Sequence, residues 1–472
     1  MKKVAKKMLA LLLVAVICLS AFGFAVMAEE EKKDEEKPEL SGEISFCTWG
    51  SQEEIETNKK VIEAFEKKYP GTKVNLEVFN DAYNETVETR YLGGQCPDVI
   101  YGHPRTFLPW ADAGMLMDLS ELYEEHEEWF NEEEWMTSLY DWYKIDGKYY
   151  ATVNGADVFV LYYNKSMCDE VGVDYPAENW SWDQLNEWAS ALTERLDEET
   201  PIRWGMNTDE GWYMNFFPYL YARGGSVFDN MLNPTKVTFY SEAAVDAIQF
   251  YSDRIHKYKN TPDGADWEFI AGGFNGEQFG SYVSGVWDTV FLSGIEDFEW
   301  DITLLPQNEK SINTALYAGY AVCSQTKNPE LAKAFAAFMM TEEGQSILAS
   351  TGLITVANKK VATSDEILKF EGAPENNIIR VTALENAVNV DANLYCWDEM
   401  VNVIAAEMSK VYQEDPISAE ECAQNIQKQL EKLLEKELAD RKDTKEKKEE
   451  KSADEEKAED EMKEEETTEE SK

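Results

Sequence analysis

The residues best suited to chemistry follow two predicted strands. Trp49, Ser51 and Gln52 come directly after a buried run, and Tyr-Gly-His at 101–103 follows another. In open α/β sheets, ligands lie beyond the carboxyl ends of the strands. Aromatic and polar groups at two independent strand ends therefore predict an open cleft that binds a small ligand, rather than a sealed core.

No catalytic signature accompanies these groups. The sequence has no GxSxG nucleophile elbow, and no Walker loop or dinucleotide fingerprint follows a strand. His occurs only 3 times, never at ligand spacing to a Cys, so we expect neither a metal nor a cofactor. Asp and Glu total 92, and this abundance leaves a glycosidase-type carboxylate pair open, although any one of them is better explained as a solvated surface group.

Length and charge narrow the class of protein. With 472 residues the chain is long enough for two domains. Lys and Arg total 44 against 92 Asp and Glu, which gives a formal net charge of -48. That field repels nucleic acid and anionic membrane surfaces, so we expect neither as a partner.

The first residues have the pattern of an export signal. Four lysines precede an apolar run over 8–27, and the small residue Ala28 closes it. We interpret 1–28 as a signal peptide cut after Ala28, with an uncleaved membrane anchor as the alternative. Ile17 stands before Cys18 where a lipoprotein needs a small residue, which disfavours lipidation.

Two charged segments flank the body of the chain. Residues 29–40 read as a flexible linker, and 438–472 as a disordered acidic tail, because segments with so few apolar residues cannot offset the entropy of ordering. Six further cysteines permit disulfides, although none forms a CxxC pair, several lie in apolar runs and buried free thiols are the alternative. They are Cys47, Cys96, Cys168, Cys323, Cys396 and Cys422.

The elements that must position the strand-end residues begin as a βαβ unit. A strand over 44–49 is followed by a helix that Ser51 and Glu54 start with a capping box. Strands over 73–79 and 98–101 follow, which predicts a parallel sheet covered by helices. Later we expect a strand over 157–163 and helices over 182–196, 242–258, from 329, 393–412 and 419–437.

Five stretches together resemble one known family. They are "ISFCTWGSQ" at 44–52, "CPDVIYGHPRTFLPWADAGMLMDLS" at 96–120, "DGKYYATVNGADVFVLYYNKS" at 146–166, "FNGEQFGSYVSGVWD" at 274–288, and "GYAVCSQTKNPELAKAFAAFMMTEEGQ" at 319–345. In this order they are similar to the bacterial extracellular solute-binding proteins of family 1, the sugar-binding components of ABC importers related to maltose-binding protein.

The resemblance implies an α/β, two-lobed periplasmic-binding-protein-like fold with a ligand cleft at the hinge, each lobe a mixed sheet flanked by helices. It places 41–155 plus 307–361 in lobe 1, and 156–306 plus 362–437 in lobe 2.

For function, the resemblance implies a secreted, monomeric protein on the outer face of the cell membrane or in the periplasm. It would capture a sugar or oligosaccharide, deliver it to ABC importer permease subunits, and perform no catalysis. A secreted carbohydrate-active hydrolase and a surface sugar sensor stay as alternatives.

The family's ligand contacts fall on residues that suit a sugar, because rings cover its C–H faces and planar polar groups bond its hydroxyls. Core packing is the alternative for the rings, and hinge capping for Asp157. The candidate ligand residues are Trp49, Ser51, Gln52, Gly102, His103, Arg105, Asp157, Trp212, Tyr213, Trp287, Asp288, Tyr320 and Trp397. Tyr320 stands where the family has a smaller residue, Asp288 is included because it adjoins Trp287, and a plain loop histidine is the alternative for His103.

Overall fold

The computed structural model describes most of the chain, namely residues 40–196, 201–207, 213–262, 270, 272–307 and 310–443. The described residues from Gly42 onward form one compact unit, and of the segment before it only Leu40 and Ser41 are described. The predicted signal peptide, nearly all of the predicted linker and residues 444–472 lie outside the described residues.

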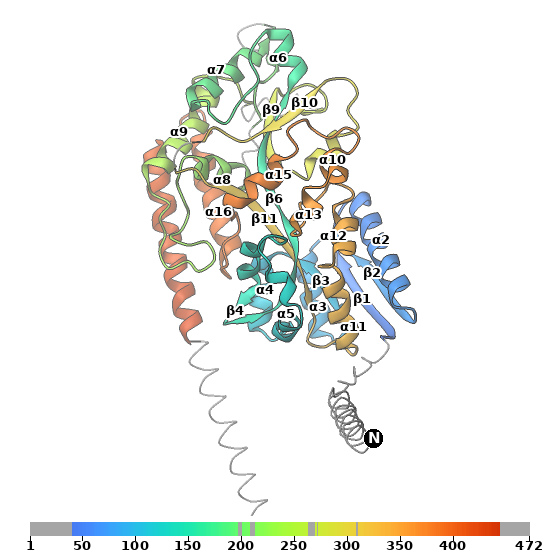
Figure 1. Ribbon diagram of the computed structural model, residues 1–472. Helices are drawn as coiled ribbons and strands as arrows, with labels where there is room; N and C mark the ends of the chain where they lie inside the picture. The colour runs from blue at the N-terminus through green and yellow to red at the C-terminus, as the bar shows by residue number, and fades with distance from the viewer. Residues whose placement is uncertain are drawn as a thin grey trace, which may run out of the picture. The chain divides into compact units, whose positions relative to one another are not determined.

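Eight strands of the described residues join in one mixed sheet (Figure 1). They are β1 (Gly42–Thr48), β2 (Thr72–Val78), β3 (Val99–Gly102), β6 (Ala151–Asn164), β9 (Ser281–Gly285), β10 (Trp300–Thr303), β11 (Asn313–Val322) and β12 (Ala387–Asn389). The path runs β10-β6-β11-β3-β1-β2, with β12 beside β11 and β9 beside β6. We call β1, β2, β3, β11 and β12 the first strand group, and β9 and β10 the second.

Strand β6 joins the two groups. Its first part pairs antiparallel with β11, up to Val158 opposite Ala315. Its second part pairs antiparallel with β9, starting at Phe159 opposite Gly285, and also with β10. All 14 residues of β6 are buried. At Gly155 a Cβ atom would lie 2.1 Å from the carbonyl oxygen of Thr355, so the close crossing of that segment requires a glycine.

The helices around the first strand group show why the local sequence folds as it does. At α2, Ser51 and Glu54 form the reciprocal capping box. Its buried face presents Phe65, whose ring lies 5.0 Å from that of Phe335. The group's helices are α2 (Gln52–Lys68), α3 (Tyr83–Leu92), α4 (Pro104–Asp112), α5 (Ser120–Glu125), α11 (Pro329–Phe338) and α12 (Glu342–Ala349).

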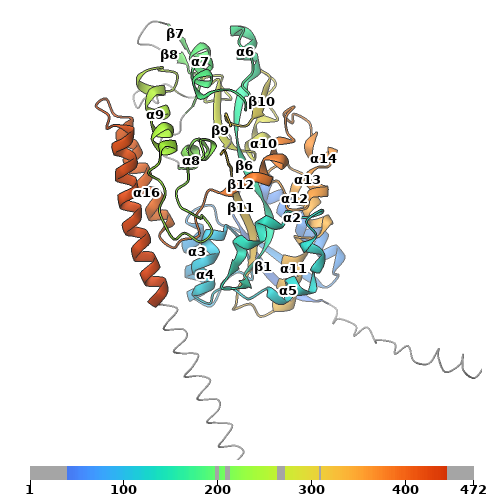
Figure 2. The ribbon, with the colours of Figure 1, turned by 60° about the vertical axis from the view of Figure 1, so that its left-hand side comes forward.

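A second set of helices surrounds the other strand group and the end of the chain (Figure 2). The set comprises α6 (Lys165–Val171), α7 (Trp182–Leu192), α8 (Tyr213–Ala222), α9 (Glu242–His256), α10 (Asp288–Leu292), α14 (Asp365–Leu368), α15 (Ile379–Thr382), α16 (Trp397–Met408) and a C-terminal helix over 419–443. The short α13 (Lys359–Ala362) packs against α12 of the first group. Short strand pairs lie at β4 (Lys144–Ile145) with β5 (Lys148–Tyr149), and β7 (Glu194–Arg195) with β8 (Pro201–Arg203). Short 3-10 helices lie at Glu127–Phe130, Thr137–Tyr143, Ala383–Asn386 and Ser409–Val411.

The C-terminal helix lies alongside α16 (Figure 2). Asn425 and Gln429 on that helix both donate hydrogen bonds to the carboxylate of Glu407. The helix continues to 443, six residues into the segment expected to be a disordered tail, and Arg441 there pairs with Glu437 and donates to the carbonyl oxygen of Asn393. Within the described residues, no helix has the length and apolar character needed to cross a bilayer.

The βαβ start predicted from sequence is confirmed, since β1 pairs in parallel with both β2 and β3. The predicted strand over 157–163 is part of the longer β6. The predicted helices over 182–196 and 242–258 correspond to α7 and α9, each ending a few residues early. The helix predicted to begin at the proline at 329 is α11.

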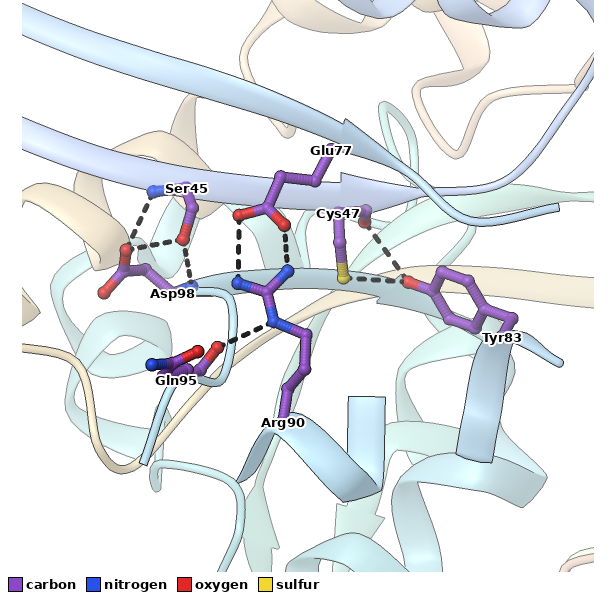
Figure 3. A network of polar contacts seen from close by, with 7 residues as sticks. All are labelled: Ser45, Cys47, Glu77, Tyr83, Arg90, Gln95 and Asp98. Atoms are coloured by element: carbon purple, nitrogen blue, oxygen red, sulfur yellow. Dashed lines mark hydrogen bonds and ion pairs between the residues drawn. The ribbon is translucent and has the colours of Figure 1, made fainter. Parts of the chain in front are cut away.

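One carboxylate ties three strands of the first group together. Asp98 Oδ2 accepts hydrogen bonds from the backbone nitrogen of Ser45 at 2.7 Å and from its hydroxyl at 2.9 Å. Asp98 Oδ1 accepts from the Thr326 hydroxyl at 2.6 Å. Figure 3 shows this carboxylate beside the ion pair of Arg90 and Glu77. The contacts hold the loop before β3 against β1 and the end of β11.

We predict that Asp98→Ala lowers the free energy of unfolding by about 3 kcal/mol, because three donors lose their acceptor at about 1 kcal/mol each. Denaturant titration measures the loss. The matched control is Glu342→Gln, which breaks a solvent-exposed ion pair with Lys360 and should leave stability almost unchanged. Equal stabilities of the two variants would contradict the structural role of Asp98.

Candidate functional site

An aromatic cluster lies at the carboxyl ends of β1 and β3. The half-buried ring of Trp49 lies 4.7 Å from the ring of Tyr83, 4.6 Å from that of Tyr101 and 5.1 Å from that of His103. The two strand ends singled out in the sequence therefore meet, and they meet through their rings.

The imidazole of His103 is held in one orientation. Its Nδ1 lies 2.8 Å from the carbonyl oxygen of Tyr317 on β11, so Nδ1 carries the hydrogen and Nε2 is an acceptor. Burial lowers the pKa of His103, which keeps the ring neutral near pH 7. The neighbouring Gly102 is fixed by packing, because a Cβ atom there would lie 2.8 Å from the Phe107 ring.

A small cavity of about 40 Å³ adjoins this cluster. It has room for a few water molecules but is well below the roughly 300 Å³ at which pockets for small organic ligands begin. Residues of β1, α2, β3, β6 and β11 line it, among them Thr48, Glu54, Tyr101, Asn154 and Tyr320. The buried Asn154 Oδ1 has no hydrogen-bond partner among the described residues, so an acceptor is available there.

Two carboxyl groups that affect each other lie here, the half-buried Glu54 and the buried Asp157. Glu54 Oε2 accepts from the backbone nitrogen of Ser51 at 2.6 Å, and burial raises the pKa of Glu54. Asp157, in β6, is 8 % exposed and accepts from the backbone nitrogen of Thr355 at 2.9 Å. Burial raises the pKa of Asp157 to about 7, although the guanidinium of Arg380 acts in the opposite direction.

Two more of the predicted residues, Trp287 and Asp288, follow β9, the strand that pairs with the second part of β6. Phe159 follows Asp157 by two residues, so both side chains lie on one face of the strand. The half-buried ring of Trp287 lies 5.4 Å from the ring of Phe159. Asp288, beside it, is half-buried, and burial raises its pKa despite hydrogen bonds from Ser284 and Tyr282.

Arg105 and Trp397 meet at one buried carboxylate. Arg105 Nε lies 3.0 Å from Asp391 Oδ2, and Arg105 also pairs with Asp398 on α16. Trp397 is 1 % exposed and its Nε1 donates to Asp391 Oδ1 at 3.0 Å. These two predicted residues therefore form a buried polar junction between the start of α4 and the start of α16.

The remaining predicted residues have different surroundings. Tyr320 is 1 % exposed, but its ring lies 5.4 Å from that of Tyr101 and it lines the cavity. Ser51 caps α2, and the exposed Gln52 donates to Glu56 along that helix. Tyr213 begins α8, and Trp212 lies outside the described residues.

Several residues of the site were not singled out from the sequence. Glu54 was interpreted only as part of a capping box, yet it also lines the cavity. Asn154 and Asp391 carried no local signal, because their partners are far away in sequence. Tyr83 likewise carried no local signal, whereas Tyr101 is one of the strand-end residues that the sequence indicates.

Sequence comparison identifies relatives. A family model described as "Bacterial extracellular solute-binding protein" matches residues 49–346. The multiple sugar-binding protein of Streptococcus mutans serotype c is 30 % identical over 169 residues, 35 % of this chain and 36 % of that protein. The arabinooligosaccharide-binding protein of Halalkalibacterium halodurans is 26 % identical over 221 residues, 45 % of this chain and 48 % of that protein. The chain thus spans less than half the length of both curated relatives.

Solved structures share the fold. An ABC substrate-binding protein from Listeria monocytogenes in complex with cycloalternan has a TM-score of 0.73 at 24 % identity, over 84 % of this chain and 99 % of that one. The GacH receptor of Streptomyces glaucescens, solved unliganded and with acarbose, has a TM-score of 0.69 at 21 % identity, over 84 % and 99 %. The two-lobed α/β fold predicted from the sequence is confirmed.

The raised pKa of Asp157 predicts a pH dependence of stability. The folded state favours the neutral acid between the unfolded pKa near 4 and the folded pKa of about 7. The unfolding free energy of the wild type therefore falls as pH rises through this window, on the order of 3 kcal/mol relative to Asp157→Asn, which keeps an acceptor for Thr355 but cannot ionise.

Chemical denaturation at pH 4 to 8 measures this difference. The matched control is Asp229→Asn: hydrogen bonds from Thr235 lower the pKa of Asp229 to about 2, so its contribution is lost only as pH falls below 4. Parallel stability curves for wild type and Asp157→Asn from pH 4 to 7 would contradict the burial of a titrating Asp157.

Proposed function

Because the chain belongs to the family of bacterial extracellular solute-binding proteins, we propose that it captures a sugar or oligosaccharide between two lobes and delivers it to the permease of an ABC importer. The protein acts outside the cell membrane, as a monomer, and performs no chemistry on its ligand. The names of its relatives, a multiple sugar-binding and an arabinooligosaccharide-binding protein, support the carbohydrate class.

The observation that carries the proposal is the alternation of rings and acceptors along one face. Trp49 offers a flat apolar surface at one end, and Trp287 offers another beside Phe159. Between them lie the carboxyl groups of Glu54 and Asp157 and the unpartnered oxygen of Asn154. Aromatic faces suit the C–H faces of a pyranose, and carboxyl and amide oxygens accept its hydroxyl protons.

We assign residues 41–155 and 307–361 to lobe 1, and 156–306 and 362–437 to lobe 2. Under this division Arg105 belongs to lobe 1, whereas both of its carboxylate partners, Asp391 and Asp398, belong to lobe 2. Their ion pairs bridge the lobes and favour a closed arrangement.

Residues of lobe 1 alone line the cavity, and its volume of about 40 Å³ is too small for a pyranose ring. In the proposed function the sugar therefore binds between the lobes, which separate to admit it. Opening breaks the Arg105 ion pairs and exposes Trp49, Asp157 and Trp287. The sugar's contacts to both lobes favour closure again, and closure shifts only as far as the ligand prefers the closed state.

We predict that titration calorimetry against a panel of mono- and oligosaccharides finds a ligand, and that Trp49→Ala weakens its binding about 10-fold, or about 1.4 kcal/mol, through loss of ring stacking. Tyr175→Ala is the matched control, because Tyr175 is 39 % exposed and its contacts with Asp169, Tyr163 and Lys165 lie outside the candidate ligand site, so its loss should leave affinity unchanged.

Melting curves confirm that both variants are folded. Two results would contradict the proposal: no sugar in the panel binds the wild type, or a reducing-end assay detects product that disappears in Asp157→Asn.

A further inference from the structure

Two cysteine thiols from distant parts of the chain lie together in the first strand group. Cys96 precedes β3 and Cys323 directly follows β11, and their thiols share a hydrogen bond. They lie at the start of β3, the end of that strand opposite to Trp49 and His103. They take no part in the proposed ligand site.

The backbone brings the two residues to this place. β3 and β11 pair antiparallel with Val99 opposite Val322. The pairing continues one step further, because the backbone nitrogen of Cys323 donates to the carbonyl oxygen of Asp98 at 2.9 Å. Cys96 stands two residues before Asp98, in the loop that leads into β3, and its thiol reaches that of Cys323.

Polar contacts fix Gln95 and Asp98, which stand on either side of Cys96 in the sequence (Figure 3). The carbonyl oxygen of Gln95 accepts a hydrogen bond from Arg90 Nε at 2.9 Å, and the backbone nitrogen of Gln95 donates one to the carbonyl oxygen of Arg90 at 2.8 Å. On the other side, Asp98 is bonded to Ser45. Cys96 itself lies before the β3–β11 ladder, so its sulfur can move the short distance to bonding range without breaking that ladder.

We propose that Cys96 and Cys323 are a redox site that a disulfide-class oxidant, such as oxidised glutathione or a disulfide exchange protein, converts to a disulfide. The half-buried Cys96 meets the oxidant, whereas Cys323 is 0 % exposed. The Cys96 thiolate attacks the oxidant's S–S bond, forms a mixed disulfide and releases one thiol. The Cys323 thiolate then attacks Cys96 Sγ and releases the second thiol. The cysteines lose two protons and two electrons, and the oxidant disulfide is reduced to two thiols.

The surroundings of the sulfurs support this pairing over the alternatives. The hydrogen bond from Cys96 lowers the pKa of Cys323, which raises the thiolate fraction for the second step, whereas the same bond and burial raise the pKa of Cys96 and make its attack on the oxidant the slow step. The nearby Cys47 is bonded to the Tyr83 hydroxyl, and burial raises its pKa to about 12, so it stays a thiol. The described residues include no group of three or more His, Cys, Asp or Glu placed to hold a metal ion.

The bond would fasten the loop before β3 to the end of β11 and enclose the whole of β6 in a covalent loop. It would restrict the unfolded chain and thereby stabilise the first strand group. The inference does not depend on sugar binding, because neither cysteine is among the residues that line the cavity.

The test uses the full chain, purified without reductant and incubated with oxidised glutathione. Alkylation under denaturing conditions followed by peptide mass spectrometry should find a Cys96–Cys323 linked peptide, with four of the six cysteines after residue 28 alkylated and all six after reduction. Reduction should lower the melting temperature of the wild type by about 3–6 °C and leave that of Cys96→Ser unchanged.

Cys168→Ser is the matched control and should retain the linked peptide, since Cys168 is buried on α6, in the other part of the molecule. Alkylation of all six cysteines after oxidation would overturn the proposal, as would a linked peptide that joins any other pair. The wild-type measurement decides the question even if Cys96→Ser or Cys323→Ser fails to fold.

Discussion

Strand β6 carries the constraint on which the rest of the structure depends, because its hydrogen bonds pass from one group of strands to the other. Up to Val158 the strand pairs with β11, and from Phe159 onward with β9 and β10. Any movement of the two strand groups relative to each other must be absorbed at this change of pairing partner. Asp157 lies one residue before it, with Thr355 bonded to its carboxyl group. The change of pairing partner and the candidate ligand site therefore involve the same few residues of β6.

The buried polar side chains at this point of β6 lower the stability of the folded state. Burial of a carboxyl group costs free energy unless it is hydrogen-bonded or neutral, and Asp157 meets the cost by one backbone bond and a raised pKa. Arg380 is fully buried nearby, and its Nη1 has no hydrogen-bond partner among the described residues. An apolar strand interior would be more stable than this arrangement. A site that must accept hydroxyl groups explains why the polar residues stand where an ordinary core would have none.

Local signals allowed much of the fold to be predicted from the sequence. Contacts between residues far apart in the sequence could not be predicted in this way. The capping box at Ser51 and the strand ends at Trp49 and His103 are set by neighbours within a few residues, and the structure brings those strand ends together. The junction of Arg105 with Asp391 joins residues 286 positions apart, and no local pattern reports it. Glu54 was recognised as a cap but not as a cavity residue, because its second role depends on β6 lying opposite. The C-terminal helix extends past its predicted end because Arg441 finds partners in Glu437 and Asn393.

In the proposed function, rings and acceptors from both strand groups enclose one ligand. A crystal structure with a sugar selected by calorimetry would show whether they do. We expect a pyranose stacked on Trp49 or Trp287, with a hydroxyl group within hydrogen-bond distance of Asp157 and contacts to both strand groups. A sugar bound elsewhere on the surface, or touching residues of one strand group alone, would contradict it.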